Sequence, residues 1–239
     1  MSLELSGTTP AIKGVAGSVS APAITGDDVD TGISFPSANT IKFSTNGVER
    51  IQITDAGISG TGISAASDFV KIATATWTSA VASVDIDSLD TTTYKYFVML
   101  WNSVPATDNT ELTFRWRLGG SDATGSSYDW ALGTNYGHST TGLAANDDKG
   151  KLVYSMGNNA WEGCQLELVI YPKSSAEAGY QGNSVIWNGF YETTATSPRS
   201  LQGALFYDGG TSYYPNGFKI YSSSGDLATG DYALYGVKR

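Results

Sequence analysis

The sequence predicts an all-β protein in which an extended N-terminal β segment precedes an antiparallel β-sandwich. Three observations lead to this fold class. The 239 residues include 28 Gly, 14 Tyr, 8 Phe and 6 Trp but only 3 Met, a composition that favours strands and turns over helices. Many short runs alternate apolar with polar residues, which is the period of a strand with one buried face. Clusters of Gly, Asp, Asn and Ser separate these runs, as tight turns separate the strands of a sandwich.

Residues 1–66 form the first predicted domain. They contain no Trp, Tyr, Cys or His, and a segment so poor in large side chains is not expected to build a core of its own. Residues 41–44 and 48–53 nevertheless alternate apolar with polar, and the Asn46-Gly47 pair between them predicts a tight hairpin. Such a hairpin can form if other chains bury its one apolar face, and homotrimerisation would supply those chains. We therefore predict that residues 1–66 are an oligomerising segment.

Residues 67–239 form the second predicted domain, the β-sandwich. In residues 112–118 apolar side chains alternate with polar ones, among them Arg115 and Arg117. These two arginines are predicted either to be isolated charges on an exposed face or to form salt bridges between protomers. Similar alternating runs occupy residues 69–77, 81–86, 94–101, 151–155, 166–171, 184–191, 201–207, 217–221 and 232–237.

Charge and cysteine content exclude several functional classes. The formal net charge is -9 and the pI is about 4.5, which opposes binding to nucleic acid. The single cysteine, Cys164, excludes an internal disulfide and is expected to be a small buried side chain. The first residues do not resemble a signal peptide, and no apolar run has the length of a transmembrane span. We expect a protein that assembles in the cytoplasm without secretion or membrane insertion.

The N-terminal segment resembles a module of tailed-bacteriophage tail fibres and related virion appendages. Residues 21–33 contain P-A-I followed by G-D-D-V-D-T-G-I, and residues 44–51 read S-T-N-G-V-E-R-I, in the order that this module shows. The resemblance implies a virion protein on the tail or capsid surface, assembled in the host cytoplasm. It also implies a homotrimer that attaches to other virion proteins through residues 1–66.

The C-terminal part is similar to a phage jelly-roll, lectin-like domain. The similarity involves residues 94–105, 112–116 and 128–130, and it ends in residues 230–237, G-D-Y-A-L-Y-G-V. It implies a non-enzymatic appendage that adsorbs to host-surface glycans. The alternative is a capsid decoration, head fibre or tail-tip protein with a purely structural role. The sequence departs most from the family in the stretches predicted to be loops, residues 135–149 and 174–183.

Sugar recognition requires aromatic faces beside amide or carboxylate groups. Several aromatic residues lie in or beside predicted loops that also carry Asp or Asn. The candidate ligand-binding residues are Trp130, Tyr136, Trp161, Tyr213, Tyr214, Asp129 and Asn216.

No catalytic residue, metal or cofactor is predicted. His138, the only histidine, lies in a polar stretch, and no G-x-S-x-G turn accompanies it. The Asp-rich residues 27–30 are expected to form a turn and not a calcium site. Carboxylates of the type that glycoside hydrolysis uses are present, but nothing in their spacing pairs them. These carboxylates are Asp129, Asp147, Asp148, Glu162 and Asp208.

Overall fold

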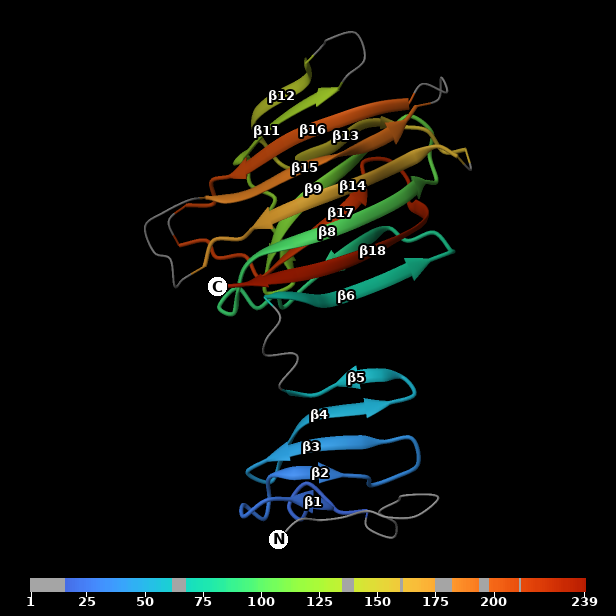
Figure 1. Ribbon diagram of the computed structural model, residues 1–239. Coiled ribbons are helices and arrows are strands. Elements are labelled where there is room, and N and C mark those ends of the chain that lie inside the picture. The colour runs from blue at the N-terminus through green and yellow to red at the C-terminus, as the bar shows by residue number, and fades with distance from the viewer. Residues whose placement is uncertain are drawn as a thin grey trace. The chain divides into compact units, whose positions relative to one another are not determined.

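The chain divides into two compact units, Met1–Asp68 and Phe69–Arg239. The computed structural model describes residues 16–61, 68–134, 140–159, 161–174, 182–193, 198–210 and 212–239. Within these residues every named element is a β-strand (Figure 1). The predicted fold class, an N-terminal β segment followed by an antiparallel β-sandwich, is confirmed.

The first unit is a five-stranded antiparallel sheet in which consecutive strands are neighbours (Figure 1). The predicted hairpin is present: Asn46 and Gly47 have φ values of 52° and 66°, as a two-residue turn with two left-handed positions requires. The strands are β1 (Ile24–Thr25), β2 (Gly32–Ser34), β3 (Ile41–Thr45), β4 (Val48–Thr54) and β5 (Gly57–Ser59).

One face of this small sheet is apolar. The strand registers align four side chains in one cross-strand row and three in the next. We call this surface the isoleucine face; it consists of Ile24, Ile33, Phe43, Ile51, Ile41, Ile53 and Ile58. Its side chains are half-buried or exposed, and Ile58 is 63% exposed. An isolated sheet of this kind needs a second layer to cover its apolar face.

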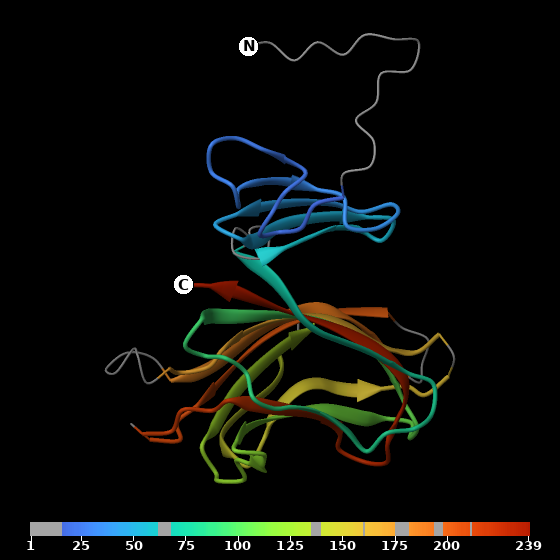
Figure 2. The same cartoon turned by 90° about the horizontal axis from the view of Figure 1, so that it is seen from below.

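The second unit is a sandwich of an eight-stranded sheet and a smaller five-stranded sheet (Figures 1 and 2). The large sheet has the order β12-β11-β16-β15-β14-β8-β18-β6, and in the small sheet β9 pairs with β10, β13 and β17, while β17 also pairs with β7. All these pairings are antiparallel. The strands are β6 (Phe69–Trp77), β7 (Ser83–Ile86), β8 (Tyr94–Pro105), β9 (Thr110–Leu118), β10 (Ser121–Asp122), β11 (Tyr128–Thr134), β12 (Thr140–Asp147), β13 (Gly150–Met156), β14 (Gly163–Tyr171), β15 (Asn183–Glu192), β16 (Pro198–Tyr207), β17 (Gly217–Ser222) and β18 (Leu227–Lys238).

Aromatic side chains fill the space between the two sheets. Trp116 on β9 and Trp187 on β15 are fully buried. The indole Nε1 of Trp187 donates to the Leu152 carbonyl oxygen at 2.9 Å, a hydrogen bond that joins the two sheets. The same ring lies over Gly203 of β16, where an added Cβ would come within 2.2 Å of it. The position of Trp187 therefore depends on the hydrogen bond to Leu152 and on the absence of a side chain at Gly203.

The structure corrects two predictions about the second unit. Part of the predicted loop 135–149 is the strand β12, which pairs with β11 alone at the edge of the large sheet. Gly142, Ala144 and Asn146 give this edge strand no alternating pattern that the sequence could reveal. Leu118 was grouped with the apolar face of its strand but is exposed at the strand end. In the other predicted loop, residues 175–181 lie outside the described residues.

The two arginines of β9 are neutralised within the chain. Arg117 Nη1 lies 2.9 Å from Asp85 Oδ2 and 2.5 Å from Asp122 Oδ1, and its Nε donates to Asp87 at 2.9 Å. The Asp87 hydrogen bond, with the charges around it, raises the pKa of Arg117. Arg115 pairs with Asp148. Neither predicted alternative describes them, because the partners come from neighbouring strands and turns of the same sheet.

Candidate functional site

The outer face of the eight-stranded sheet carries a band of polar, hydrogen-bonding side chains. Paired residues of antiparallel strands project from the same face, so the registers define rows across the sheet. One row reads Ser200, Phe190, Gln165, Asn102 and Asp231, and the adjacent row reads Gln202, Asn188, Glu167 and Leu100. We call these two rows the amide band. The alternate residues of the same strands point into the core, which fixes the orientation of the band.

Three shallow depressions lie along the amide band. Their volumes are about 480, 340 and 270 Å³. Asn188 borders all three, and Gln202 borders two. Gly133, on β11 beside Gln202, has no side chain to fill the space there. The depressions therefore follow one another across the sheet, from β11 to Asp231 on β18.

The chemistry of this surface is suited to hydroxyl groups. Each exposed Asn or Gln amide offers two donors and an acceptor, whereas Glu167 and Asp231 accept. Asn102 Nδ2 donates to Asp231 Oδ2 at 3.2 Å, which orients that carboxylate. Among the described residues that line the three depressions there is no Lys, Arg or His. The described lining residues of the site are thus rich in acceptors and amides and include no cation.

An apolar row lies next to the amide band on the same face. It includes Leu143, which is 77% exposed, and Ile186, which is 53% exposed. We call it the apolar band; its members are Leu143, Ala131, Ala204, Ile186, Val169, Val98 and Tyr235. The outer face of the small sheet differs, since it carries the ion-paired arginines described above. A contiguous exposed apolar strip of this kind is typical of a contact surface.

The predicted ligand-binding residues of β11, Trp130 and Asp129, make local structural contacts. Trp130 was placed in or beside a loop, but it lies on the inner side of β11, where it is buried and its Nε1 donates to Asp147 Oδ2 at 3.1 Å. Its ring is therefore not available for stacking. Asp129 is exposed on the outer face but accepts from the Asn146 backbone N–H at 2.9 Å. Tyr136 lies outside the described residues.

The candidates between β16 and β17 have structural contacts. The ring of Tyr213 packs edge-on against Tyr207 with centroids 5.1 Å apart, and burial raises the pKa of Tyr213 to about 12. The ring of Tyr214 lies 5.3 Å from Lys173 Nζ. Asn216 Oδ1 accepts from the Gly119 N–H at 3.0 Å and so supports a neighbouring turn.

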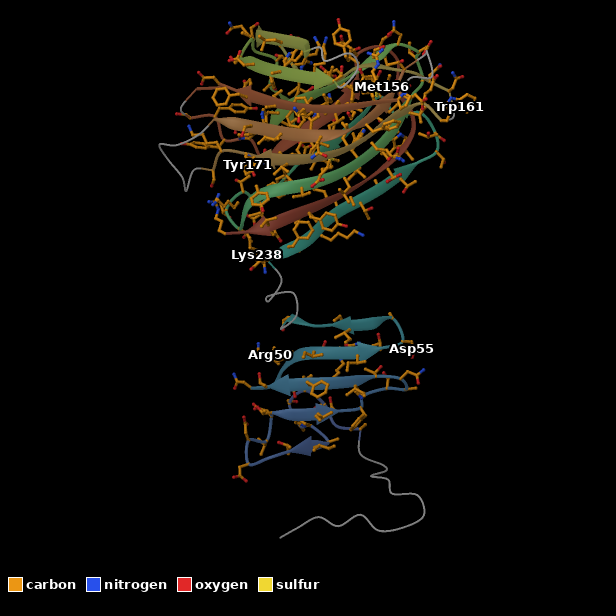
Figure 3. All side chains as sticks on the ribbon, turned by 45° about the horizontal axis from the view of Figure 1, so that its top comes forward. Arg50, Asp55, Met156, Trp161, Tyr171 and Lys238 are labelled. Atoms are coloured by element: carbon orange, nitrogen blue, oxygen red, sulfur yellow. The ribbon has the colours of Figure 1, made fainter. Side chains whose placement is uncertain are left out.

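Among the predicted aromatic residues that the structure describes, Trp161 is the one that is largely exposed, at 67% (labelled in Figure 3). It belongs to a short turn closed by two contacts of 2.9 Å: Asn159 N–H donates to Glu162 Oε2, and Glu162 N–H donates to the Asn159 carbonyl. Glu162 is itself buried. The turn ends at the start of β14, the strand that carries Gln165 and Glu167. The other described candidates lie on β11 or between β16 and β17, away from this turn in the sequence.

The carboxylates considered for hydrolysis act as local structural acceptors. In addition to Asp129, Asp147 and Glu162, Asp148 pairs with Lys149 and Arg115, and Asp208 accepts from the Gly210 N–H at 3.1 Å. In the N-terminal unit, Asp28 accepts from the Thr31 hydroxyl at 2.7 Å, which lowers the pKa of Asp28. His138 lies outside the described residues.

The described ranges hold neither a metal-binding cluster nor a membrane-spanning helix. No three His, Cys, Asp or Glu side chains there are placed to hold a metal ion. In the same ranges, no helix has the length and apolar character needed to cross a bilayer.

Cys164 is a buried core residue, as predicted. Its Sγ lies 3.6 Å from Ser103 Oγ, and burial raises the pKa of its thiol to about 12. Since the thiolate is the reactive form, we expect native protein to leave a thiol-specific disulfide reagent almost unconsumed at pH 8. Unfolded protein should consume one equivalent. Rapid reaction of the native protein would show that β14 opens readily from β8.

The residues of the amide band were not among the predicted site residues. Their sequence signal is only that polar residues alternate with core residues, as in Gln165-Leu166-Glu167-Leu168. The pairing register that brings β16, β15, β14, β8 and β18 into line is not readable from a single strand. Comparison of the chain with protein-family models, with curated proteins and with solved structures gave no match.

Proposed function

We propose that the protein is a non-enzymatic structural component of a tailed-bacteriophage virion that self-associates through its N-terminal unit and adsorbs to host-surface glycans. The resemblance of residues 21–51 to a tail-fibre module supports the virion assignment. The observation that carries the adsorption role is the amide band with its three depressions centred on Asn188.

The isoleucine face supports self-association. Seven apolar side chains on one side of a five-stranded sheet are too many to leave in water, and copies of the same chain can supply the missing layer. We propose a homotrimer, the state that the family resemblance implies. A trimer also presents three copies of the second unit, which we call the head.

Shallow sites suit multivalent adsorption. A depression of a few hundred Å³ on an open sheet face gives weak binding to one glycan. Three heads held together convert weak contacts into avidity without any tighter individual site. Weak, repeated contacts also let a particle sample the cell surface.

The apolar band favours a second candidate function, a decoration or tail-tip protein with a purely structural role. Leu143 and Ile186 are large, apolar and exposed, and a neighbouring virion protein would bury them. In that case the head would stabilise the particle and would not contact the host.

Adsorption assays separate the two functions. Purified protein is incubated with cells of the strain that the phage infects, and particle adsorption is then measured. The control variant is Lys219→Ala, which removes an ion pair on the small sheet and leaves the amide band unchanged. The adsorption role predicts that the purified protein binds the cells and reduces particle adsorption in proportion to its concentration. Tight retention on particles without any binding to cells would favour the structural role.

A further inference from the structure

We infer that the amide band takes an extended, uncharged oligosaccharide that runs across the strands of the large sheet. The inference rests on the proposed adsorption function and specifies the ligand class of the same site. It follows from the charge, the length and the polar chemistry of the band.

The charge of the band selects against acidic glycans. Glu167 and Asp231 line the 340 Å³ depression, and no cation accompanies them among the described lining residues. A uronate, a sialic acid or a phosphate placed there would meet two carboxylates without a compensating Lys or Arg. The net charge of -9 adds long-range repulsion.

The length of the band selects a chain of sugars over a single one. The depressions extend over β11, β16, β15, β14, β8 and β18, which are consecutive neighbours in the sheet. Neighbouring strands lie about 4.8 Å apart, so six strands span about 24 Å. A ligand aligned with the depressions therefore crosses the strands.

The side chains match the two kinds of surface that a neutral sugar offers. The amides of Gln202, Asn188 and Gln165 can both donate to and accept from hydroxyl groups. Phe190 is partly exposed between Ser200 and Gln165 in its row, and Leu100 is exposed beside Glu167. These two apolar side chains can contact the C–H faces of the rings.

Binding to immobilised polysaccharides tests the inference with the full-length protein. The probes are neutral glucans, mannans and galactans, acidic polyuronate and polysialic acid, and a cationic glucosamine polymer, each measured at low and physiological salt. We expect saturable binding to at least one neutral polymer and none to the acidic ones. Asn188→Ala should weaken that binding about tenfold, the effect of losing one or two hydrogen bonds. Asn158→Ala, an exposed amide outside the band, should leave it unchanged.

Glu167→Gln provides a second readout, because it removes charge and keeps shape. We expect it to weaken neutral binding by about threefold, because a charged acceptor becomes a neutral amide. Preferential binding of wild type to an acidic or cationic polymer would overturn the ligand class while leaving adsorption intact. Binding to host cells but to no polysaccharide, or neutral binding insensitive to Asn188→Ala, would also overturn it. Failure to bind host cells at all would instead remove the proposed adsorption function.

Discussion

Replacing Phe43 by aspartate is expected to abolish the proposed self-association and to leave monomers. Phe43 lies between Ile33 and Ile51 in the central row of the isoleucine face. Burying a carboxylate in a contact between copies costs several kcal/mol per ion, so the association constant should fall on the order of a hundredfold or more. The second unit has its own core and should remain folded.

Light scattering of the full-length protein measures this effect directly. The matched control is Gln52→Asp, which adds the same charge on the opposite face, beside Lys42. A fragment that begins at Asp68 should have the mass of a monomer or of a weaker oligomer. If Phe43→Asp keeps an oligomeric wild-type mass, the isoleucine face is not the contact between copies. If the wild-type protein is itself a monomer, the proposed self-association through the N-terminal unit is wrong.

Replacing Trp187 by alanine is expected to lower the free energy of unfolding by about 3 to 5 kcal/mol. The substitution leaves a large cavity between the two sheets and removes the hydrogen bond to the Leu152 carbonyl. It also uncovers Gly203, over which the indole packs. Few other single substitutions in the head disturb both sheets in this way.

Denaturant unfolding monitored by circular dichroism provides the measurement. Ile186→Ala is the control, since Ile186 is the preceding residue of β15 but points to the outer face. It should cost less than about 1 kcal/mol. A larger loss for Ile186→Ala than for Trp187→Ala would mean that the strand faces are assigned the wrong way round, and equal losses would mean that Trp187 is not the main contact between the sheets.

Much of the strand content could be predicted from alternation alone. The run 69–77 coincides with β6, and the Asn46-Gly47 turn is at the predicted place. Edge strand β12 was missed because a strand with only one neighbour and little burial has no need of an alternating pattern. Local sequence thus identifies strands that bury one face and does not identify strands held mainly by backbone pairing.

The candidate site was much less predictable. Trp130 and Tyr213 were chosen for their residue type, yet the ring of Trp130 is buried in the core and the ring of Tyr213 packs against the core from the side. The amide band consists mostly of ordinary outward-facing polar residues from five strands. Only the registers of those strands place Asn188 beside Gln202 and Glu167, and register depends on contacts between distant parts of the chain.

The position of β18 has a consequence for biosynthesis. This strand lies between β8 and β6 in the large sheet. Strands β6 and β8 are therefore synthesised well before β18, the strand that pairs with both of them. Until then both have unpaired edges, which attract proteases, chaperones and other nascent chains. A ribosome that stops before β18 therefore releases a head that cannot close. Such incomplete chains would be degraded, and only complete chains would accumulate as folded protein.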